Sequence, residues 1–242
     1  MAFYEDFSKV YDQVMDQSLY DQWLAFTNRH LAKTTQSIFE LACGSGALSV
    51  RLAQQGYQIV GLDISEEMLT LASQKATRAG VSIDFVAGDM RELSGLGPFD
   101  CVTCYSDSIC YMEDLNEVKK VFSEVSSVLT KGGQFLFDVH SLHQMDAIFP
   151  GTSYHENEED FAFLWDSFAG ESAHAVIHEL TFFVKDTDGK FVRKDEVHKE
   201  RTYEMEQYLS ALTDFSKVEV YADFTDDAPN QESLRWFFVC VK

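Results

Sequence analysis

The residues best suited to chemistry gather around a glycine turn near the start of the chain. Residues 38–46 read Ile-Phe-Glu-Leu-Ala-Cys-Gly-Ser-Gly, which is typical of a buried strand followed by a Gly-x-Gly turn. The helix predicted next begins with free backbone N–H groups, and glycines let a ligand approach the backbone. Asp63 and Asp89 follow at the ends of two later strands. This order of elements predicts a nucleoside pocket at the carboxyl edge of an α/β sheet.

An acidic residue beside the turn bears on the charge of that nucleoside. Glu40 directly precedes the turn, where it would repel a pyrophosphate and attract a cation. The dinucleotide fingerprint Gly-x-Gly-x-x-Gly/Ala is also incomplete, because its third position is Ser49. These residues favour S-adenosylmethionine (SAM), which carries a sulfonium and an ammonium, over NAD. We expect Asp63 to accept both ribose hydroxyls and Asp89 to accept the adenine amino group.

Strands and helices alternate along most of the chain and predict the frame that positions these residues. Repeated alternation indicates a mostly parallel, doubly wound sheet with helices on both faces. The predicted strands are 36–41, 57–62, 82–86, 99–105, 134–139, 216–224 and 234–241, and the predicted helices are 18–31, 46–55, 65–79, 114–130 and 204–213.

The alternation breaks after Pro150. Residues 154–160 are polar and acidic, and 161–168, 173–185 and 190–203 are typical of antiparallel strands, with Asp188-Gly189 as a hairpin turn. We therefore predict a core of residues 1–149 and 204–242, with a helical cover at its N-terminal end. Residues 150–203 form a β-rich insertion, interpreted as a lid or as a wall of the acceptor site; its aromatic residues would otherwise pack its own sheet.

Composition narrows the classes of partner. Lys and Arg number 19 against 40 Asp and Glu, a net charge of −21 that disfavours nucleic acid and anionic membranes. We expect no signal peptide and no membrane span. The five cysteines predict reduced thiols in the cytoplasm. No His and Cys spacing predicts a metal site.

Three segments carry a resemblance to a known family. Residues 40–46 (Glu-Leu-Ala-Cys-Gly-Ser-Gly), 61–65 (Gly-Leu-Asp-Ile-Ser) with Met68, and 87–90 (Ala-Gly-Asp-Met) resemble motifs of class I SAM-dependent methyltransferases of the small-molecule type. Residues 99–111 and 129–133 resemble two later segments, although the family often has proline where this chain has Lys131. The resemblance covers residues 36–140 well and the last forty in outline.

The resemblance implies a seven-stranded sheet with an antiparallel last strand, and it assigns the SAM site. By resemblance to the family, the backbone of the first turn (Ala42, Gly44 and Gly46) would lie against the methionine part of SAM. Ile64 and Met90 would sandwich the adenine, with Met68 nearby. Glu40, Asp63 and Asp89 would bind as expected above.

The acceptor side is less determined by the sequence. Tyr11 is the preferred cover residue over the sulfonium, since aromatic faces suit cations, although such aromatics also dock helices onto a core. Tyr105 lies at the end of the fourth strand and is expected to contact SAM or take part in catalysis. Asp107 is a further candidate there, or a cap of the next turn. His140, at the end of the fifth strand, is a possible base or a bystander.

Two classes of function remain open at this point. The first is an enzyme that transfers a methyl group from SAM to a small or medium-sized molecule, leaving S-adenosylhomocysteine (SAH). The alternative is a non-catalytic sensor or partner subunit that binds SAM or SAH. The edge strands of the insertion also make a homodimer possible.

Overall fold

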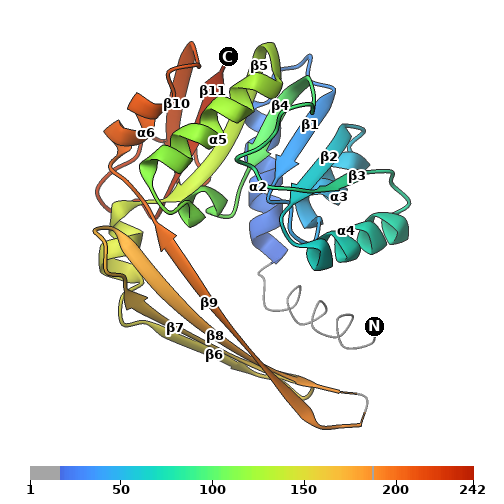
Figure 1. Cartoon of the computed structure of the whole chain (residues 1–242), viewed down its shortest axis with the longest axis vertical. Helices are drawn as coiled ribbons and strands as arrows, with labels where there is room; N and C mark the ends of the chain where they lie inside the picture. Colours follow the sequence, from blue (N-terminus) through green and yellow to red (C-terminus); the bar gives the residue numbers. More distant parts are fainter. Residues whose placement is uncertain (1–16, 187) are drawn as a thin grey trace.

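The computed structural model describes residues 17–186 and 188–242, which form two β-sheets flanked by helices (Figure 1). The larger sheet has seven strands in the order β10-β11-β5-β4-β1-β2-β3. Its strands are β1 (Ser37–Leu41), β2 (Gln58–Asp63), β3 (Asp84–Ala87), β4 (Phe99–Cys104), β5 (Leu129–His140), β10 (Lys217–Ala222) and β11 (Arg235–Val241). Only β11 is antiparallel to its neighbours β5 and β10. The predicted seven-stranded, mostly parallel, doubly wound sheet is confirmed.

Helices cover both faces of this sheet (Figure 1). On one face, α5 (Leu115–Val128) and α6 (Met205–Ala211) pack against a large apolar cluster that includes Phe122 and Tyr208. On the other, α2 (Gln17–His30) and α3 (Ala47–Gln54) pack through Trp23, Phe26 and Leu48. Helix α4 (Glu66–Ala79) lies beside α3. Burial on both faces explains the apolar strands that identified the sheet.

Local capping fixes where the helices begin. Ser65 accepts a hydrogen bond from the backbone N–H of Met68 at 3.2 Å, so α4 begins directly after β2. Asp114 caps α5 in the same way. That helix ends at Val128, two residues before the predicted end, because the chain from Leu129 already extends β5. Leu129 pairs with Phe99 of β4, and the register shifts before the next pair, Cys101 with Gln134, a pairing that the apolar periodicity of β5 does not reveal.

The insertion forms a second, antiparallel sheet in the order β6-β7-β8-β9. Its strands are β6 (Ser153–Asn157), β7 (Phe161–Ala169), β8 (Ala175–Lys185) and β9 (Phe191–Arg201), preceded by a short π-helix, η2 (Gln144–Ile148). No strand is predicted over the polar and acidic residues 154–160, whereas β6 covers the first part of this segment. Strand β6 is an edge strand with mostly exposed side chains, so it lacks the apolar alternation that marks a strand.

The N-terminal segment with Tyr11 lies outside the described residues. Among the helices that are described, none is both long and apolar enough to cross a membrane. All five cysteines are free and buried. Within the described residues, β7, β8 and β9 reach back from the tip of the insertion to the carboxyl edge of the large sheet (Figure 1), which brings the two sheets together around one cleft.

Candidate active site

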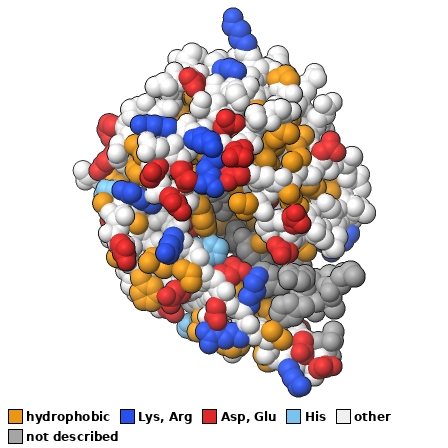
Figure 2. All heavy atoms as spheres, viewed as in Figure 1, with side chains coloured by type: hydrophobic (Ala, Val, Ile, Leu, Met, Phe, Trp, Pro, Cys, Tyr) orange, Lys and Arg blue, Asp and Glu red, His pale blue; other side chains and the backbone are white. Residues whose placement is uncertain are grey.

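A cleft of about 2050 Å³ lies between the carboxyl edge of the large sheet and the inner face of the insertion sheet. Charged side chains of both signs surround the hollow on this face (Figure 2). The predicted site residues that line the cleft are Glu40, Ala42, Gly44, Asp63, Ile64, Met68, Asp89, Met90, Tyr105 and His140. These residues come from five separate segments of the chain.

Asp63 ties the glycine turn to the end of β2. One carboxylate oxygen accepts the backbone N–H of Gly44 at 2.7 Å, and the other accepts that of Ser65 at 2.9 Å. Asp63 is largely buried but faces the cleft. Each oxygen keeps a second lone pair, so the carboxylate is held in a fixed orientation with acceptor capacity left for a pair of hydroxyls.

The two glycines of the turn have different surroundings. A Cβ at Gly44 would have no atom within 4 Å, which is the open space a ligand needs against the backbone. A Cβ at Gly46 would lie 2.8 Å from the Cβ of Ala72 on α4. Gly46 is not among the residues that line the cleft. Its small size serves the packing of α3 against α4, whereas Gly44 and Ala42 border the ligand space.

Glu40 is a buried carboxyl beneath the turn, and Ser49 donates its hydroxyl to it. Burial, with the nearby charge of Asp63, raises the pKa of Glu40 from 4.5 to about 7. The residue that made the dinucleotide fingerprint incomplete, Ser49, thus serves as the partner of Glu40. A cationic ligand beside Glu40 would favour its ionised form.

The adenine end of the predicted pocket is apolar and open. Ile64 is 75% exposed although it is a large apolar residue, and it borders the cleft with Met68 and Met90. The carboxylate of Asp89 accepts two hydrogen bonds from the guanidinium of Arg91, one from Nε at 2.9 Å and one from Nη2 at 2.5 Å. This pairing lowers the pKa of Asp89 and keeps it an acceptor.

Tyr105 lines the cleft, but its hydroxyl points into the packing of α2. It lies 2.9 Å from the Oγ1 of the fully buried Thr27, and its ring stacks on Trp23. Burial raises the pKa of Tyr105 well above its ordinary value. A phenol held protonated and bonded in the core is not available as a base, so the predicted catalytic role of Tyr105 is not supported by its position.

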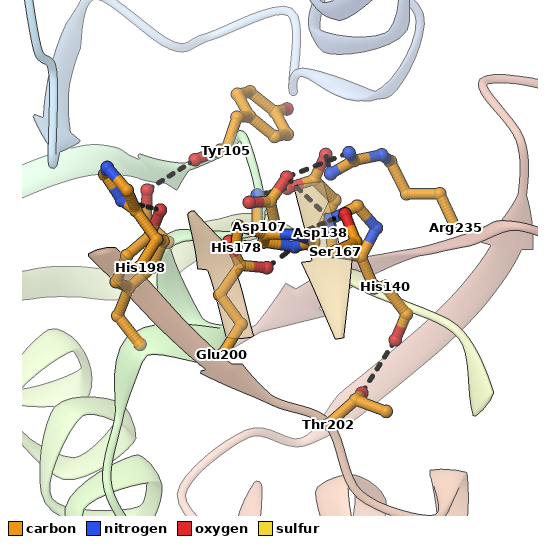
Figure 3. A network of polar contacts seen from close by, with 12 residues as sticks. Tyr105, Asp107, Asp138, His140, Ser167, His178, His198, Glu200, Thr202 and Arg235 are labelled. Atoms are coloured by element: carbon orange, nitrogen blue, oxygen red, sulfur yellow. Dashed lines mark hydrogen bonds and ion pairs between the residues drawn. The ribbon is translucent and has the colours of Figure 1, made fainter. Parts of the chain in front are cut away.

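An ion-pair network lies at the ends of β4 and β5 (Figure 3). Arg235 of β11 donates to Asp107 and to Asp138, each at 2.9 Å. The Nε2 of His140 lies 3.2 Å from the same Asp107 oxygen. Ser106 and Asp107 both adopt left-handed backbone conformations, which turn Asp107 into the network rather than onto the next helix. His140 is therefore part of a fixed polar network and not an isolated loop residue.

The insertion adds two side chains to this network that the sequence did not single out as site residues. Glu200 of β9 is 6% exposed, and its Oε2 lies 3.7 Å from His140 Nε2. His178 of β8 lies on its other side, with 3.9 Å between Nε2 and Glu200 Oε1. The only available signal was their inward position in an alternating strand, which does not distinguish a site from ordinary packing.

Hydrogen bonds fix the tautomer of His178. Trp165 donates its indole N–H to His178 Nδ1 at 3.0 Å, so the proton of the neutral ring lies on Nε2 and faces Glu200. Burial lowers the pKa of His178 to about 4. Burial together with the charge of Asp107 raises the pKa of Glu200 well above its ordinary value.

One group of candidate metal ligands occurs among the described residues. Ligand atoms of Asp107, His140 and Glu200 lie within 4.8 Å of one another. Arg235 already holds Asp107 at 2.9 Å, so a divalent cation there would stand beside a guanidinium. The arrangement fits an anionic anchor for an organic ligand better than a metal centre.

Comparison with known proteins agrees with this geometry. Residues 38–133 match the model of a methyltransferase domain. A protein of Geobacillus sp. (strain WCH70) is 42% identical, and YqeM of Bacillus subtilis (strain 168) is 40% identical; both are named as methyltransferases without a stated substrate. Alignments cover 99% of this chain in both cases, with 99% and 97% of the relatives.

Solved structures share the whole fold, including the insertion. A SAM-dependent methyltransferase of Clostridium acetobutylicum superposes with a TM-score of 0.84 at 25% identity, over 98% of both chains. SAM-bound CalS10 of Micromonospora echinaspora, an amino pentose methyltransferase, superposes with a TM-score of 0.73 at 18% identity, over 97% of this chain and 95% of that one. The open space at Gly44, the fixed acceptor at Asp63 and the buried carboxyl of Glu40 fit a SAM molecule. The chain belongs to the class I SAM-dependent methyltransferases, and SAM is its cofactor.

Proposed function

We propose that this enzyme methylates a small molecule bound between the two sheets. The observation that carries this proposal is the double origin of the cleft lining: predicted SAM-binding residues at the ends of β1, β2 and β3 line it from the large sheet, and His178 and Glu200 line it from the insertion. SAM supplies a methyl group already activated by its sulfonium. The protein's task is to align the two reactants and exclude water.

Residues of the large sheet bind the donor in this proposal. Asp63 takes the ribose hydroxyls, Ile64 and Met90 cover the adenine, and Asp89 takes the adenine amino group. The backbone at Gly44 lies against the methionine part, with the Glu40 carboxylate close to the positive charges. Tyr11, which lies outside the described residues, remains the predicted cover of the sulfonium.

The insertion provides the wall of the acceptor site. Phe163, Trp165 and Phe182 line the cleft from the insertion sheet, although Phe163 and Phe182 also pack its small core. Such a wall suits a metabolite with an apolar part, which fits the small-molecule methyltransferases among the relatives. A sensor that only binds SAM would have no need for a polar network shared by β5 and the insertion.

Labelled methyl transfer tests this function. The protein is incubated with methyl-labelled SAM and the small-molecule fraction of a Bacillus subtilis extract, because a relative in that organism is 40% identical along the whole chain. We expect label in one class of small molecule, with formation of SAH. Tight SAM binding without any transfer of label would instead favour the sensor.

The proposal also covers the cellular setting and the assembly state of the protein. A net charge of −21 disfavours nucleic acid as a partner, and five buried free thiols suit a reducing cytoplasm. The edge strands β6 and β9 leave a homodimer possible. Light scattering on the purified protein, at low and at high concentration, determines the mass of the particle.

A further inference from the structure

The buried network at the acceptor side carries more carboxylates than fixed cations. Asp138 and Glu200 are buried and Asp107 is largely buried, and Arg235 is the only guanidinium that contacts them among the described residues. Arg235 is shared between Asp107 and Asp138. Glu200 therefore has no lysine or arginine partner within the described part of the chain.

The surroundings of Glu200 leave one of its oxygens unpaired. Tyr111 donates a hydrogen bond to the carboxyl group, but Oε2 has no hydrogen-bond partner among the described residues. His140 at 3.7 Å and His178 at 3.9 Å are both too distant to bond. A buried carboxylate oxygen without a partner is costly unless a ligand supplies a donor.

We propose that Glu200 binds the amino group of the acceptor, so that the enzyme is an N-methyltransferase for a small amine. This inference rests on the proposed function and names the acceptor's nucleophile. A protonated amine supplies the donor and the charge that Glu200 lacks. Phe149 and Trp165, which line the cleft beside His178, offer aromatic surface to the rest of the molecule.

The chemistry of amine methylation matches an anionic site. The bound ammonium first passes a proton to the Glu200 carboxylate, whose pKa is raised by burial, and becomes a neutral amine. The nitrogen lone pair then forms the new N–C bond while the C–S bond breaks and leaves its electron pair on sulfur. The positive charge moves from sulfur to nitrogen, while Glu200 keeps the proton that it took from the ammonium. The anionic carboxylate favours an acceptor that arrives as a cation, whereas a neutral alcohol brings no charge to pair with it.

The position of the transferred methyl group tests the inference. The product formed from the extract with 13C-methyl SAM is isolated, and its methyl carbon is assigned by two-dimensional NMR. We expect an N-methyl signal whose chemical shift titrates with the amine. A methyl group on oxygen or carbon overturns the inference and leaves the proposed function standing; absence of any product overturns both.

A matched pair of variants tests the role of Glu200 itself. Glu200→Gln should lower kcat/KM for the isolated acceptor by about a hundredfold or more, with unchanged SAM affinity and circular dichroism. Asp195→Asn removes the same charge from the outer face of β9, where Asp195 is exposed, and should leave both constants unchanged. Equal effects of the two variants would overturn the assignment. So would activity that is lost with EDTA and restored by Mn²⁺, since that result indicates a metal at Asp107, His140 and Glu200.

Discussion

The backbone N–H of Gly44 donates a 2.7 Å hydrogen bond to the carboxylate of Asp63. This bond joins the turn after β1 to the end of β2, the two segments proposed to contact different parts of SAM. Asp63 thus fixes the shape of the turn, in addition to the ribose contact proposed for it.

Asp63→Ala is expected to weaken SAM binding at least tenfold, or about 1.4 kcal/mol, because charge-assisted bonds to the ribose are lost. Calorimetric titration with SAM measures the change. Asp84→Ala is the control, because Asp84 is an exposed aspartate at the start of the neighbouring strand β3, at the opposite end of the sheet. Unchanged affinity in Asp63→Ala would show that the ribose assignment is wrong.

The two glycines of the turn should respond differently to alanine. Both have positive φ, so each substitution costs roughly 1 kcal/mol of stability in backbone strain. Gly46→Ala adds a clash with Ala72 and should be clearly the less stable in urea unfolding. Gly44→Ala should instead be the more damaging to SAM affinity, since its new methyl group enters the ligand space. Reversed ranks in the two measurements would contradict the division of roles.

Glu40 should make the ligand-free protein less stable at alkaline pH. Its raised pKa means that the folded state keeps a proton which the unfolded chain loses near pH 4.5. Stability from this proton is present below pH 4.5 and is lost as the pH rises to about 7. The free energy of unfolding of Glu40→Gln should therefore be about 3 kcal/mol larger than that of the parent at pH 8. The two proteins should differ little at pH 4.5. Equal stability of both proteins at pH 8 would refute the raised pKa.

The same carboxyl should couple SAM binding to pH. A cation favours the ionised form of Glu40, so SAM binding releases a proton when the free protein is still protonated. Affinity should rise between about pH 6 and 8, with proton release detected as a dependence of the binding enthalpy on the buffer. In Glu40→Gln, the pH dependence of SAM affinity that comes from Glu40 should be lost, and only the dependence caused by the titration of SAM itself should remain. An identical pH profile in the variant would argue against contact between Glu40 and the cation.

Removal of Arg235 should be much more damaging than removal of an exposed arginine. Arg235→Met removes the guanidinium that pairs with the carboxylates of Asp107 and Asp138. The substitution should cost about 3–5 kcal/mol of unfolding free energy. Arg29→Met, which breaks an exposed pair with Asp226, should cost about 1 kcal/mol or less. Urea denaturation of both variants measures the difference, and similar losses would mean that the buried network is not a unit.

The sequence could bring the predicted donor residues to one edge of the sheet because its signals are local. Gly44, Asp63 and Asp89 each lie at the end of a strand or within three residues of it, and parallel strands bring their carboxyl ends to one edge. The start of β5 at Leu129 and the edge strand β6 were missed because strand pairing, and not apolar alternation, defines them.

The acceptor half could not be predicted in the same way. Glu200 lies 60 residues after His140 in the chain, and only the return of β9 to the large sheet brings them within 3.7 Å. Tyr105 shows the opposite case: its position at the end of β4 was predicted, but the direction of its hydroxyl depends on Thr27 of α2. Side-chain direction of this kind is decided by tertiary packing.

The four-stranded insertion has a consequence for how such an enzyme diversifies. Its strands occupy one continuous stretch of the chain between β5 and α6, and that stretch contributes Glu200 and His178 but none of the predicted SAM-binding residues. Exchange of this one segment would replace much of the acceptor wall while the turn at Gly44 and the carboxylate of Asp63 stay intact. In the proposed function, donor binding and acceptor choice therefore belong to separate stretches of the chain.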